Sequence, residues 1–261
     1  RDVWARRRMW DGWYGVRPDD RLLHAGAFKW SFTLVSGLLD PCALGARAIV
    51  PRPENEPAIL PDLLKQTNST ILAGVPGVYR KILKSGGSLA LPSLRHGLSA
   101  GETLPVALRD RWRNQTGTEI YEALGMSECS TYVSASPTRP APSGAIGFVQ
   151  NGRSVAVLGE DGEPVARGET GVLAVHRNEP GLMLGYLDKP KDAPTLPLSG
   201  DWFLTGDTVR MEQDDSIFYV GRSDDMINAG GYRVSPLEVE DAFAEVTGVS
   251  ECAAVAVQVK G

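Results

Sequence analysis

Residues 124–128, Leu-Gly-Met-Ser-Glu, contain a glycine, a serine and a glutamate, which together could bind a phosphate group and its Mg²⁺ ion. Gly125 lets the backbone come close to a ligand, because glycine has no Cβ. The Ser127 hydroxyl can bond to a phosphate oxygen, and the Glu128 carboxylate can hold Mg²⁺ against phosphates. Taken alone, a glycine turn with a surface glutamate explains the segment more simply, so it indicates a site only together with other motifs.

A second acidic candidate, Asp207, follows Thr205 and Gly206 at the expected end of a strand. A carboxylate fixed there can accept two hydrogen bonds from a ribose diol, as acidic residues do in dinucleotide-binding folds. The simpler alternative is an ordinary aspartate in a turn. Asp207 therefore predicts a nucleotide site only if a phosphate-binding segment accompanies it.

Residues 221–234 combine an arginine, paired acids and a double glycine at a point where the sequence pattern changes. Arg222 can neutralise a phosphate or bond to ribose. Gly230 and Gly231 would let a thin ligand arm pass close to the backbone. A linker between domains with a salt bridge is the alternative that this segment alone would favour.

Short apolar runs alternate with helical patterns ahead of the first motif, as in βαβ units on a parallel sheet. The expected strands are residues 47–50, 70–73, 94–99 and 119–121, and the expected helices are 58–66, the segment after Pro76, and 106–114. Residues 1–135 are therefore expected to be α/β, with the motif at 124–128 directly after the last strand.

The remaining chain has two further patterns. Residues 136–222 show Pro and Gly punctuation around short alternating strands, with a hairpin turn expected at Asp161-Gly162. From residue 223 onward, Ser235 is expected to cap a helix that begins at Pro236, followed by a strand at 251–259. We therefore expect a β-rich subdomain at 136–222 and, at 223–261, the incomplete start of a small α+β domain.

Composition and charge exclude several classes of protein. With 42% hydrophobic and 23% charged residues, the chain is neither disordered nor fibrous. A net charge of −5 argues against a nucleic-acid partner, and the cluster Arg6 to Arg8 is expected to be the solvated face of a helix. Three scattered cysteines support neither disulfides nor zinc, and no apolar run is long enough to cross a membrane. A cytoplasmic location is expected.

The order of these motifs resembles the acyl- and aryl-CoA synthetases of the adenylate-forming superfamily. Ser99-Ala100-Gly101-Glu102 precedes residues 124–128, which are followed by 205–207 and 221–240, in the family's order and across essentially the whole chain. Residues 28–30, 74–80 and 228–233 look most like the medium-chain acyl-CoA and benzoate-CoA ligases. The resemblance implies a ligase that converts a carboxylic acid and ATP to an acyl-adenylate, from which coenzyme A displaces AMP.

The resemblance also implies roles for individual residues. The ATP or AMP site would comprise Gly101, Glu102, Glu122, Ala123, Leu124, Gly125, Met126, Ser127, Asp207 and Arg222. Ser127 and Glu128 would be catalytic, with Glu128 also holding Mg²⁺. The coenzyme A path would comprise Gly230, Gly231, Tyr232 and Arg233, and Asp224 would be the hinge of the small domain. Walls of the acid pocket are expected from residues 24–30, 73–75 and 98–101, where Lys29 could meet a polar substituent, although a solvated lysine is the simpler expectation.

Three departures from the family pattern matter. Leu124 stands where many relatives carry an aromatic residue that stacks on adenine. The chain shows no Ser/Thr/Gly-rich phosphate loop and no Pro-Lys-Thr-x-x-Gly-Lys segment, so we expect it to be a truncated part of the fold that is inactive alone. Two alternatives stay open, an adenylation domain that loads a carrier protein and a non-catalytic nucleotide-binding relative. A homo-oligomer is also left open.

Overall fold

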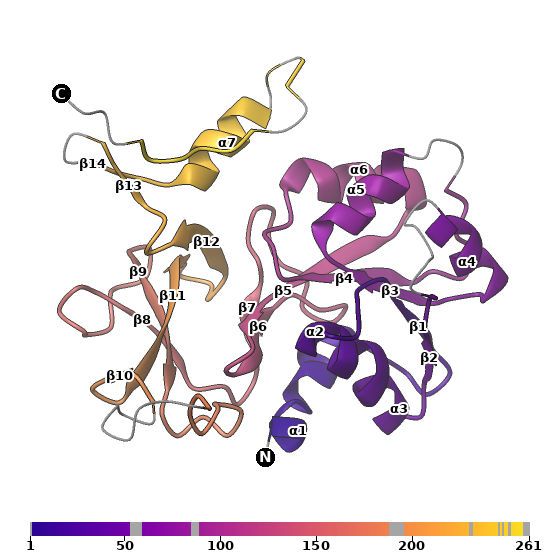
Figure 1. Cartoon of the computed structure of the whole chain (residues 1–261), viewed down its shortest axis with the longest axis horizontal. Coiled ribbons are helices and arrows are strands. Elements are labelled where there is room, and N and C mark those ends of the chain that lie inside the picture. Colours follow the sequence, from indigo (N-terminus) through magenta and orange to yellow (C-terminus); the bar gives the residue numbers. More distant parts are fainter. Residues whose placement is uncertain are drawn as a thin grey trace. The chain divides into compact units, whose positions relative to one another are not determined.

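The computed structural model describes residues 2–52, 59–84, 89–187, 196–229, 232–244, 246, 248–249 and 252–257. The chain divides into two compact units (Figure 1). The first unit comprises Arg1–Arg153 with Pro180–Met183, and the second comprises Ser154–Glu179 with Leu184–Gly261. The division into three ranges expected from the sequence stays a prediction, and each unit is described by itself.

A seven-stranded sheet forms the centre of the first unit. The strand order is β2 (Arg47–Ile49), β1 (Arg21–His24), β3 (Ile71–Gly74), β4 (His96–Ala100), β5 (Glu119–Met126), β6 (Ser130–Ser134) and β7 (Phe148–Val149). Neighbouring strands from β2 to β5 are parallel, whereas β6 and β7 join in antiparallel orientation. β3 and β4 are buried along their whole length, as strands of a sheet covered on both faces must be.

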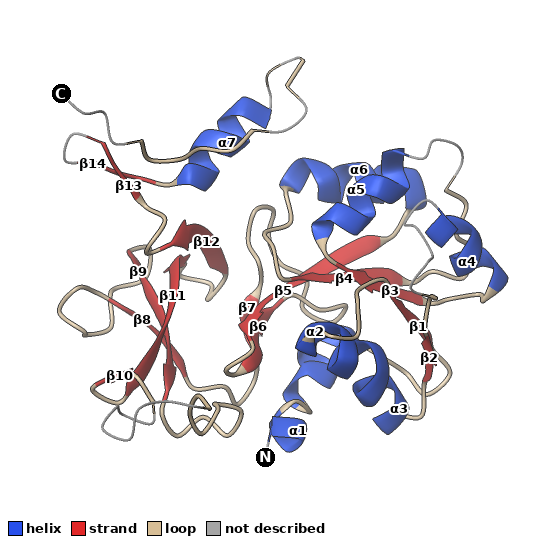
Figure 2. Cartoon of the chain, in the orientation of Figure 1, coloured by secondary structure: helices blue, strands red, loops and turns tan. Residues whose placement is uncertain are grey.

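Helices cover both faces of this sheet (Figure 2). One face carries α4 (Leu60–Gln66), α5 (Pro76–Lys84) and α6 (Val106–Thr116), and the other carries α1 (Asp2–Ala5), α2 (Ser31–Leu34), α3 (Asp40–Ala43) and two π-helices, Trp10–Tyr14 and Val35–Leu39. Successive strand residues point to opposite faces. Leu23 and Leu72 accordingly join the core with α4 to α6, while Leu22 and Ile71 join the core that includes Trp13.

The α/β expectation for this part of the chain is confirmed, with one correction at the first motif. β5 continues to Met126, so residues 124–126 belong to the strand and do not form a loop after it. The reason lies at Gly125, where an added Cβ would stand 2.4 Å from the Ser130 carbonyl oxygen and the Thr131 Cα. The motif therefore ends a strand and turns into the antiparallel β6. The short strand β1, which no strong pattern marks, was not predicted.

The second unit contains a five-stranded antiparallel sheet. Its strands are β8 (Val155–Leu158), β9 (Thr170–His176), β10 (Leu198–Ser199), β11 (Trp202–Met211) and β12 (Ile217–Arg222). The turn expected at Asp161-Gly162 is confirmed, because Gly162 has φ +82 and a bridge joins Leu158 to Pro164.

The end of the chain forms a hairpin and a helix, namely β13 (Ile227–Ala229), β14 (Tyr232–Val234) and α7 (Pro236–Ala244). Ser235 caps this helix as predicted, since its Oγ accepts the Glu238 N–H at 3.4 Å. The strand expected at 251–259 is wrong for residues 252–257, and its remaining residues lie outside those described. Instead of pairing with a strand, Ala254 donates its N–H to the Glu240 carboxylate at 2.9 Å.

No helix among the described residues is both long enough and apolar enough to cross a membrane.

Candidate functional site

The connection from β4 to α6 carries the first two predicted nucleotide residues, Gly101 and Glu102. Gly101 follows the last residue of β4 and has φ +93, a conformation that favours glycine. Three residues later, the Leu104 N–H donates to the Glu122 carboxylate at 2.8 Å. The connection is therefore tied to the neighbouring strand β5, while Glu102 itself is exposed.

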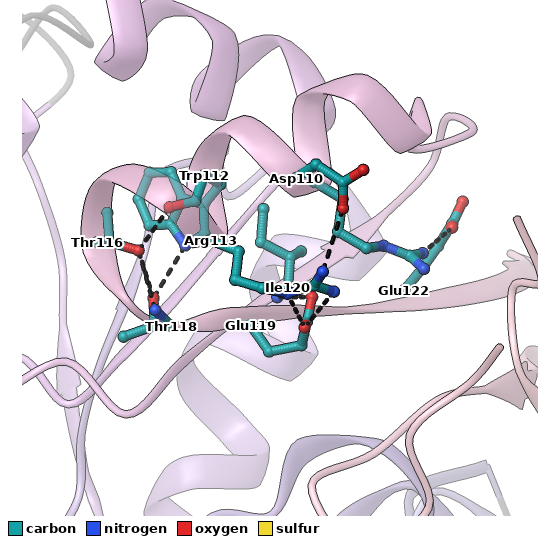
Figure 3. A network of polar contacts seen from close by, with 9 residues as sticks. Asp110, Trp112, Arg113, Thr116, Thr118, Glu119, Ile120 and Glu122 are labelled. Carbon is teal, nitrogen blue, oxygen red and sulfur yellow. Dashed lines mark hydrogen bonds and ion pairs between the residues drawn. The ribbon is translucent and has the colours of Figure 1, made fainter. Parts of the chain in front are cut away.

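The Glu122 side chain points toward α6 (Figure 3). Its carboxylate accepts a hydrogen bond from Arg109 at 3.0 Å, and both side chains are buried. Burial raises the pKa of Glu122 to about 7, although the Leu104 N–H and the Arg109 guanidinium act in the opposite direction. The carboxylate thus fixes the connection that contains Gly101, and the predicted role of Glu122 in binding the nucleotide stays a prediction.

Ser127 and Glu128 occupy the turn between β5 and β6. The Ser127 side chain is exposed, and its Oγ lies 3.4 Å from the Ser31 Oγ. Glu128 is half-buried, and its carbonyl accepts the Met183 N–H at 2.6 Å. Two hydroxyls therefore lie close together at this end of the sheet, and both could donate hydrogen bonds to a phosphate.

Glu128 is also the predicted Mg²⁺ ligand. Within the described residues, no group of three or more His, Cys, Asp or Glu side chains could hold a metal ion by itself. Mg²⁺ commonly binds through one or two carboxylates together with water and substrate phosphates. A single carboxylate in a turn that is predicted to bind phosphate therefore fits this ion, with Glu128 as the residue that would hold it.

A cavity of about 300 Å³ opens in the first unit beside this turn. Four of the predicted nucleotide residues line it, Gly101, Gly125, Met126 and Ser127. Of the expected acid-pocket walls, residues 24–30 and 98–101 contribute Trp30, Ala100 and Gly101, whereas 73–75 contribute none. The other lining residues are Arg6, Met9, Ser31, Phe32, Val35, Ser36, Ser130 and Thr131.

Arg6 corrects the expectation that residues 6–8 are a solvated helix face. Its side chain is only 5% exposed and forms an ion pair with Asp40, with Nη2 to Oδ2 at 2.8 Å. The local pattern of three arginines could not show this, because the partner lies 34 residues away in the chain. Arg7 is exposed, as expected, and Arg8 is half-buried.

In the second unit, strand pairing brings Asp207 and Arg222 opposite one another. The Arg222 Nη1 lies 3.4 Å from the Asp207 Oδ1 and donates to the Thr205 carbonyl at 3.0 Å. Gly206, with φ +79, makes room for it, because a Cβ there would stand 2.6 Å from the Arg222 Nη2. The Thr205-Gly206-Asp207 motif is therefore built around the Arg222 guanidinium.

Asp207 and Asp224 lie in different environments beside Arg222. Asp207 is 6% exposed, and burial raises its pKa although Arg222 acts in the opposite direction. Asp224 is exposed, and a hydrogen bond from the Arg222 Nε at 3.1 Å lowers its pKa. The Tyr219 hydroxyl, which sequence reasoning missed, donates to Asp207 at 3.3 Å, and burial raises the Tyr219 pKa. Its place in the strand after the motif gave no signal of that contact.

The predicted coenzyme A residues are only partly visible. Gly230 and Gly231 lie outside the described residues. Tyr232 and Arg233 belong to β14, where their backbones pair with Ala229 and Asn228 of β13. Their role in binding coenzyme A, and that of Asp224 as a hinge, stay predictions.

Comparisons with known proteins identify the family of the chain. Residues 2–187 match the model of the family described as AMP-binding enzyme. The chain is 29% identical to the human mitochondrial acyl-coenzyme A synthetase ACSM2A over 96% of its length, and 31% identical to rat ACSM2 over the same share. It covers only 44% of each of these relatives.

Solved structures show the same fold. The anthranilate CoA ligase AuaEII, in complex with anthranoyl-AMP, has 27% identity and a TM-score of 0.86 over 97% of this chain. A benzoate CoA ligase from Burkholderia xenovorans has 26% identity and a TM-score of 0.85 over 99% of it. This chain spans about half of each. It therefore belongs to the family of AMP-binding enzymes, as part of an adenylate-forming fold whose relatives are acyl- and aryl-CoA ligases.

Proposed function

We propose that the full-length protein is an AMP-forming acid–thiol ligase, which activates a carboxylic acid with ATP and transfers the acyl group to coenzyme A. The observation that supports this most is the cavity of the first unit, which Gly101, Gly125, Met126 and Ser127 all line although they come from two strand ends. Membership of the AMP-binding family supports the same assignment.

In this proposal the turn between β5 and β6 holds the reacting phosphate. The Ser127 hydroxyl donates to a phosphate oxygen, and Glu128 holds Mg²⁺, which neutralises charge on the phosphates. Both groups act by positioning and by stabilising charge that develops in the transition state. Removing either one should therefore lower the rate of adenylation more than the affinity for ATP.

Asp207 and Arg222 are proposed to bind the ribose of a nucleotide. The Asp207 carboxylate lies between the Tyr219 hydroxyl and the Arg222 guanidinium, which together orient it. A carboxylate held in this way accepts hydrogen bonds from both hydroxyls of a ribose diol. Arg222, which is partly exposed, adds positive charge close to the nucleotide.

The proposed acceptor is coenzyme A, whose pantetheine arm would pass residues 230–233. An adenylation domain that loads a carrier protein is the competing assignment. The full-length protein should be incubated with ATP, Mg²⁺, a panel of carboxylic acids and either coenzyme A or a purified carrier domain. Mass spectrometry should detect an acyl-CoA and an equal amount of AMP. Acyl transfer to the carrier alone would contradict the proposed acceptor, and a mixture without acid is the control for ATP hydrolysis.

We propose the cytoplasm as the location, following the cysteine pattern, which is typical of a reducing compartment. The human and rat relatives are named as mitochondrial proteins, so the mitochondrion is the competing location. Fractionation of the cells that make the full-length protein, with an antibody raised against this chain, distinguishes the two.

A further inference from the structure

Ser130, the first residue of β6, has an unusual backbone conformation. Its φ is +62, in the left-handed region that a non-glycine residue rarely adopts. Among the described residues, the other non-glycine residues with positive φ are Asn68 and Asp215. Asparagine and aspartate tolerate this region because their short polar side chains bond to nearby backbone. The conformation of Ser130 therefore requires another source of stabilisation.

The turn from β5 to β6 explains why a left-handed residue is needed at this position. Residues 127–129 join Met126 to Ser130, and these two residues face each other across the strand pair. Antiparallel strands that are joined by three residues commonly have a left-handed residue at the end of the turn, where glycine is preferred. The φ of Ser130 therefore helps to set the direction in which Ser127 and Glu128 leave the sheet.

The Ser130 hydroxyl contacts a buried arginine from the beginning of the chain. The Arg6 Nη1 donates a hydrogen bond to the Ser130 Oγ, although the two residues are 124 positions apart in the sequence. The Arg6 Nη2 also lies 2.9 Å from the Tyr14 Oη and 3.2 Å from the Ser36 Oγ. Arg6 therefore links the turn to the elements that precede β2.

An ion pair fixes the position of the Arg6 guanidinium. Its Nε and Nη2 both donate to the Asp40 Oδ2, at 3.2 Å and 2.8 Å, which fixes the direction of Nη1. The side chains of Arg6 and Asp40 are 5% and 4% exposed. A hydrogen bond from a charged donor is stronger than one between neutral groups. The bond from Arg6 therefore offsets the cost of the left-handed conformation of Ser130.

The backbone on either side of Ser130 is held by contacts that do not involve Arg6. The Arg153 Nη2 donates to the Thr131 carbonyl at 2.7 Å. The Glu128 carbonyl accepts the Met183 N–H at 2.6 Å. A residue that adopts positive φ without help from Arg6 should therefore leave the turn in place.

The role of this link rests on the proposed function, in which the turn holds the reacting phosphate and Mg²⁺. We propose that Arg6 is a positioning residue for adenylation. Its hydrogen bond keeps Ser130 in the left-handed conformation, and this conformation places Ser127 and Glu128 for the phosphate. Arg6 acts through Ser130 and not by contact with the reacting atoms.

The test is acid-dependent pyrophosphate exchange by the full-length protein and its variants Ser130→Ala and Ser130→Gly. Both variants lack the hydroxyl that Arg6 contacts, but only glycine adopts positive φ without a steric cost. In Ser130→Ala we expect kcat to fall by about tenfold, the effect of modest backbone strain on a positioned group. The KM for ATP should change by less than about threefold, because positioning acts on the rate. Ser130→Gly should keep kcat within about threefold of the wild-type value.

Ser69→Ala is the matched control for the loss of a buried hydroxyl. Ser69 is 1% exposed, and its Oγ lies 2.7 Å from the Thr67 Oγ1. It precedes β3, whereas the turn at Ser127 follows the end of β5, and the two strands run parallel through β4. Ser69→Ala should reduce stability in urea denaturation without changing kcat. A fall in kcat equal to that of Ser130→Ala would assign the effect to lost stability and overturn the inference.

The two Ser130 variants separate the backbone role from a direct contact. Ser130 lines the cavity, so the alternative is that its hydroxyl binds the ligand itself. In that case Ser130→Ala and Ser130→Gly would lose kcat or ATP affinity equally, which would overturn the inference. Wild-type kcat in Ser130→Ala would overturn it as well. Either result leaves the ligase assignment standing, whereas a wild-type protein that shows no exchange with any acid would contradict the proposed function and this inference together.

Discussion

Each unit contains a carboxylate of the predicted nucleotide site that pairs with an arginine, and the two pairs differ in how exposed they are. In the first unit, Glu122 pairs with Arg109, and both side chains are less than a tenth exposed. In the second unit, Asp207 pairs with Arg222, whose side chain is 41% exposed and which also reaches the exposed Asp224. The Glu122–Arg109 pair is buried and stabilises the backbone connection beside it. The Asp207–Arg222 pair has a partly exposed arginine, so a ligand can reach it. The two carboxylates are similarly buried, since Asp207 is itself only 6% exposed, and the exposure of the paired arginine is what distinguishes the two pairs.

The largest expected effect comes from breaking the buried pair. Glu122→Ala should lower the free energy of unfolding of the chain by about 3–5 kcal/mol, because it leaves Arg109 charged, buried and without its partner. Urea denaturation measures this difference. Glu119→Ala is the matched control, since Glu119 lies on the same strand and pairs with the half-exposed Arg113. It should cost no more than about 1 kcal/mol, and equal losses in the two variants would contradict the assignment of Glu122 as a buried support.

The sequence predicted the helices and strands better than it predicted the pairing of charged side chains. The alternation of elements predicted the parallel sheet. The family resemblance assigned Asp207 and Arg222 to one site, and the β11–β12 pairing brings these two residues opposite one another. The direction of the Glu122 side chain could not be predicted, because it depends on Arg109 in a helix packed on the sheet. Arg6 was misjudged for the same reason, since its partner Asp40 is remote in the chain. The local sequence pattern predicts helices and strands. Which charged side chains are buried depends on residues distant in the sequence that pack against them.

A second expected effect concerns pH in the first unit. His96 is 2% exposed, its Nε2 lies 2.8 Å from the Tyr14 carbonyl oxygen, and burial lowers its pKa to about 4. His96 takes up a proton near pH 6.5 in the unfolded chain, whereas it stays neutral in the folded unit. The free energy of unfolding is therefore at its full value above pH 6.5 and decreases as the pH falls toward 4. The loss should reach about 3 kcal/mol. His96→Gln should flatten this part of the pH profile of unfolding, and an unchanged slope would show that His96 is not the group responsible.

In the second unit the expected effect is on binding. Asp207→Ala in the full-length protein should weaken ATP binding by about 1.5–3 kcal/mol, since it removes hydrogen bonds to a charged group. Isothermal titration calorimetry measures the change. Asp201→Ala is the control, because Asp201 is in the same unit and forms an exposed pair with Arg177. ATP affinity that is unchanged in Asp207→Ala, or reduced equally in Asp201→Ala, would remove Asp207 from the proposed site.

The smallest effect on ATP affinity is expected at Asp224. Its side chain is 69% exposed, so Asp224→Pro should change ATP affinity by less than about threefold. Proline fixes φ near −65° and would restrict the rotation expected at a hinge. Adenylation and thioester formation, measured separately, should then differ in how far they are impaired. An equal loss in both half-reactions would argue against Asp224 as the hinge.

The most direct test of the ligase assignment is acid-dependent exchange of labelled pyrophosphate into ATP by the full-length protein, compared with Glu128→Gln. We expect exchange that requires both a carboxylic acid and Mg²⁺, and that falls by about 10²-fold or more in the variant, as for other groups that stabilise developing charge. ATP binding without exchange, over a broad panel of acids, would instead identify a non-catalytic relative. Exchange that is as fast in Glu128→Gln as in the wild-type protein would contradict the role given to this turn.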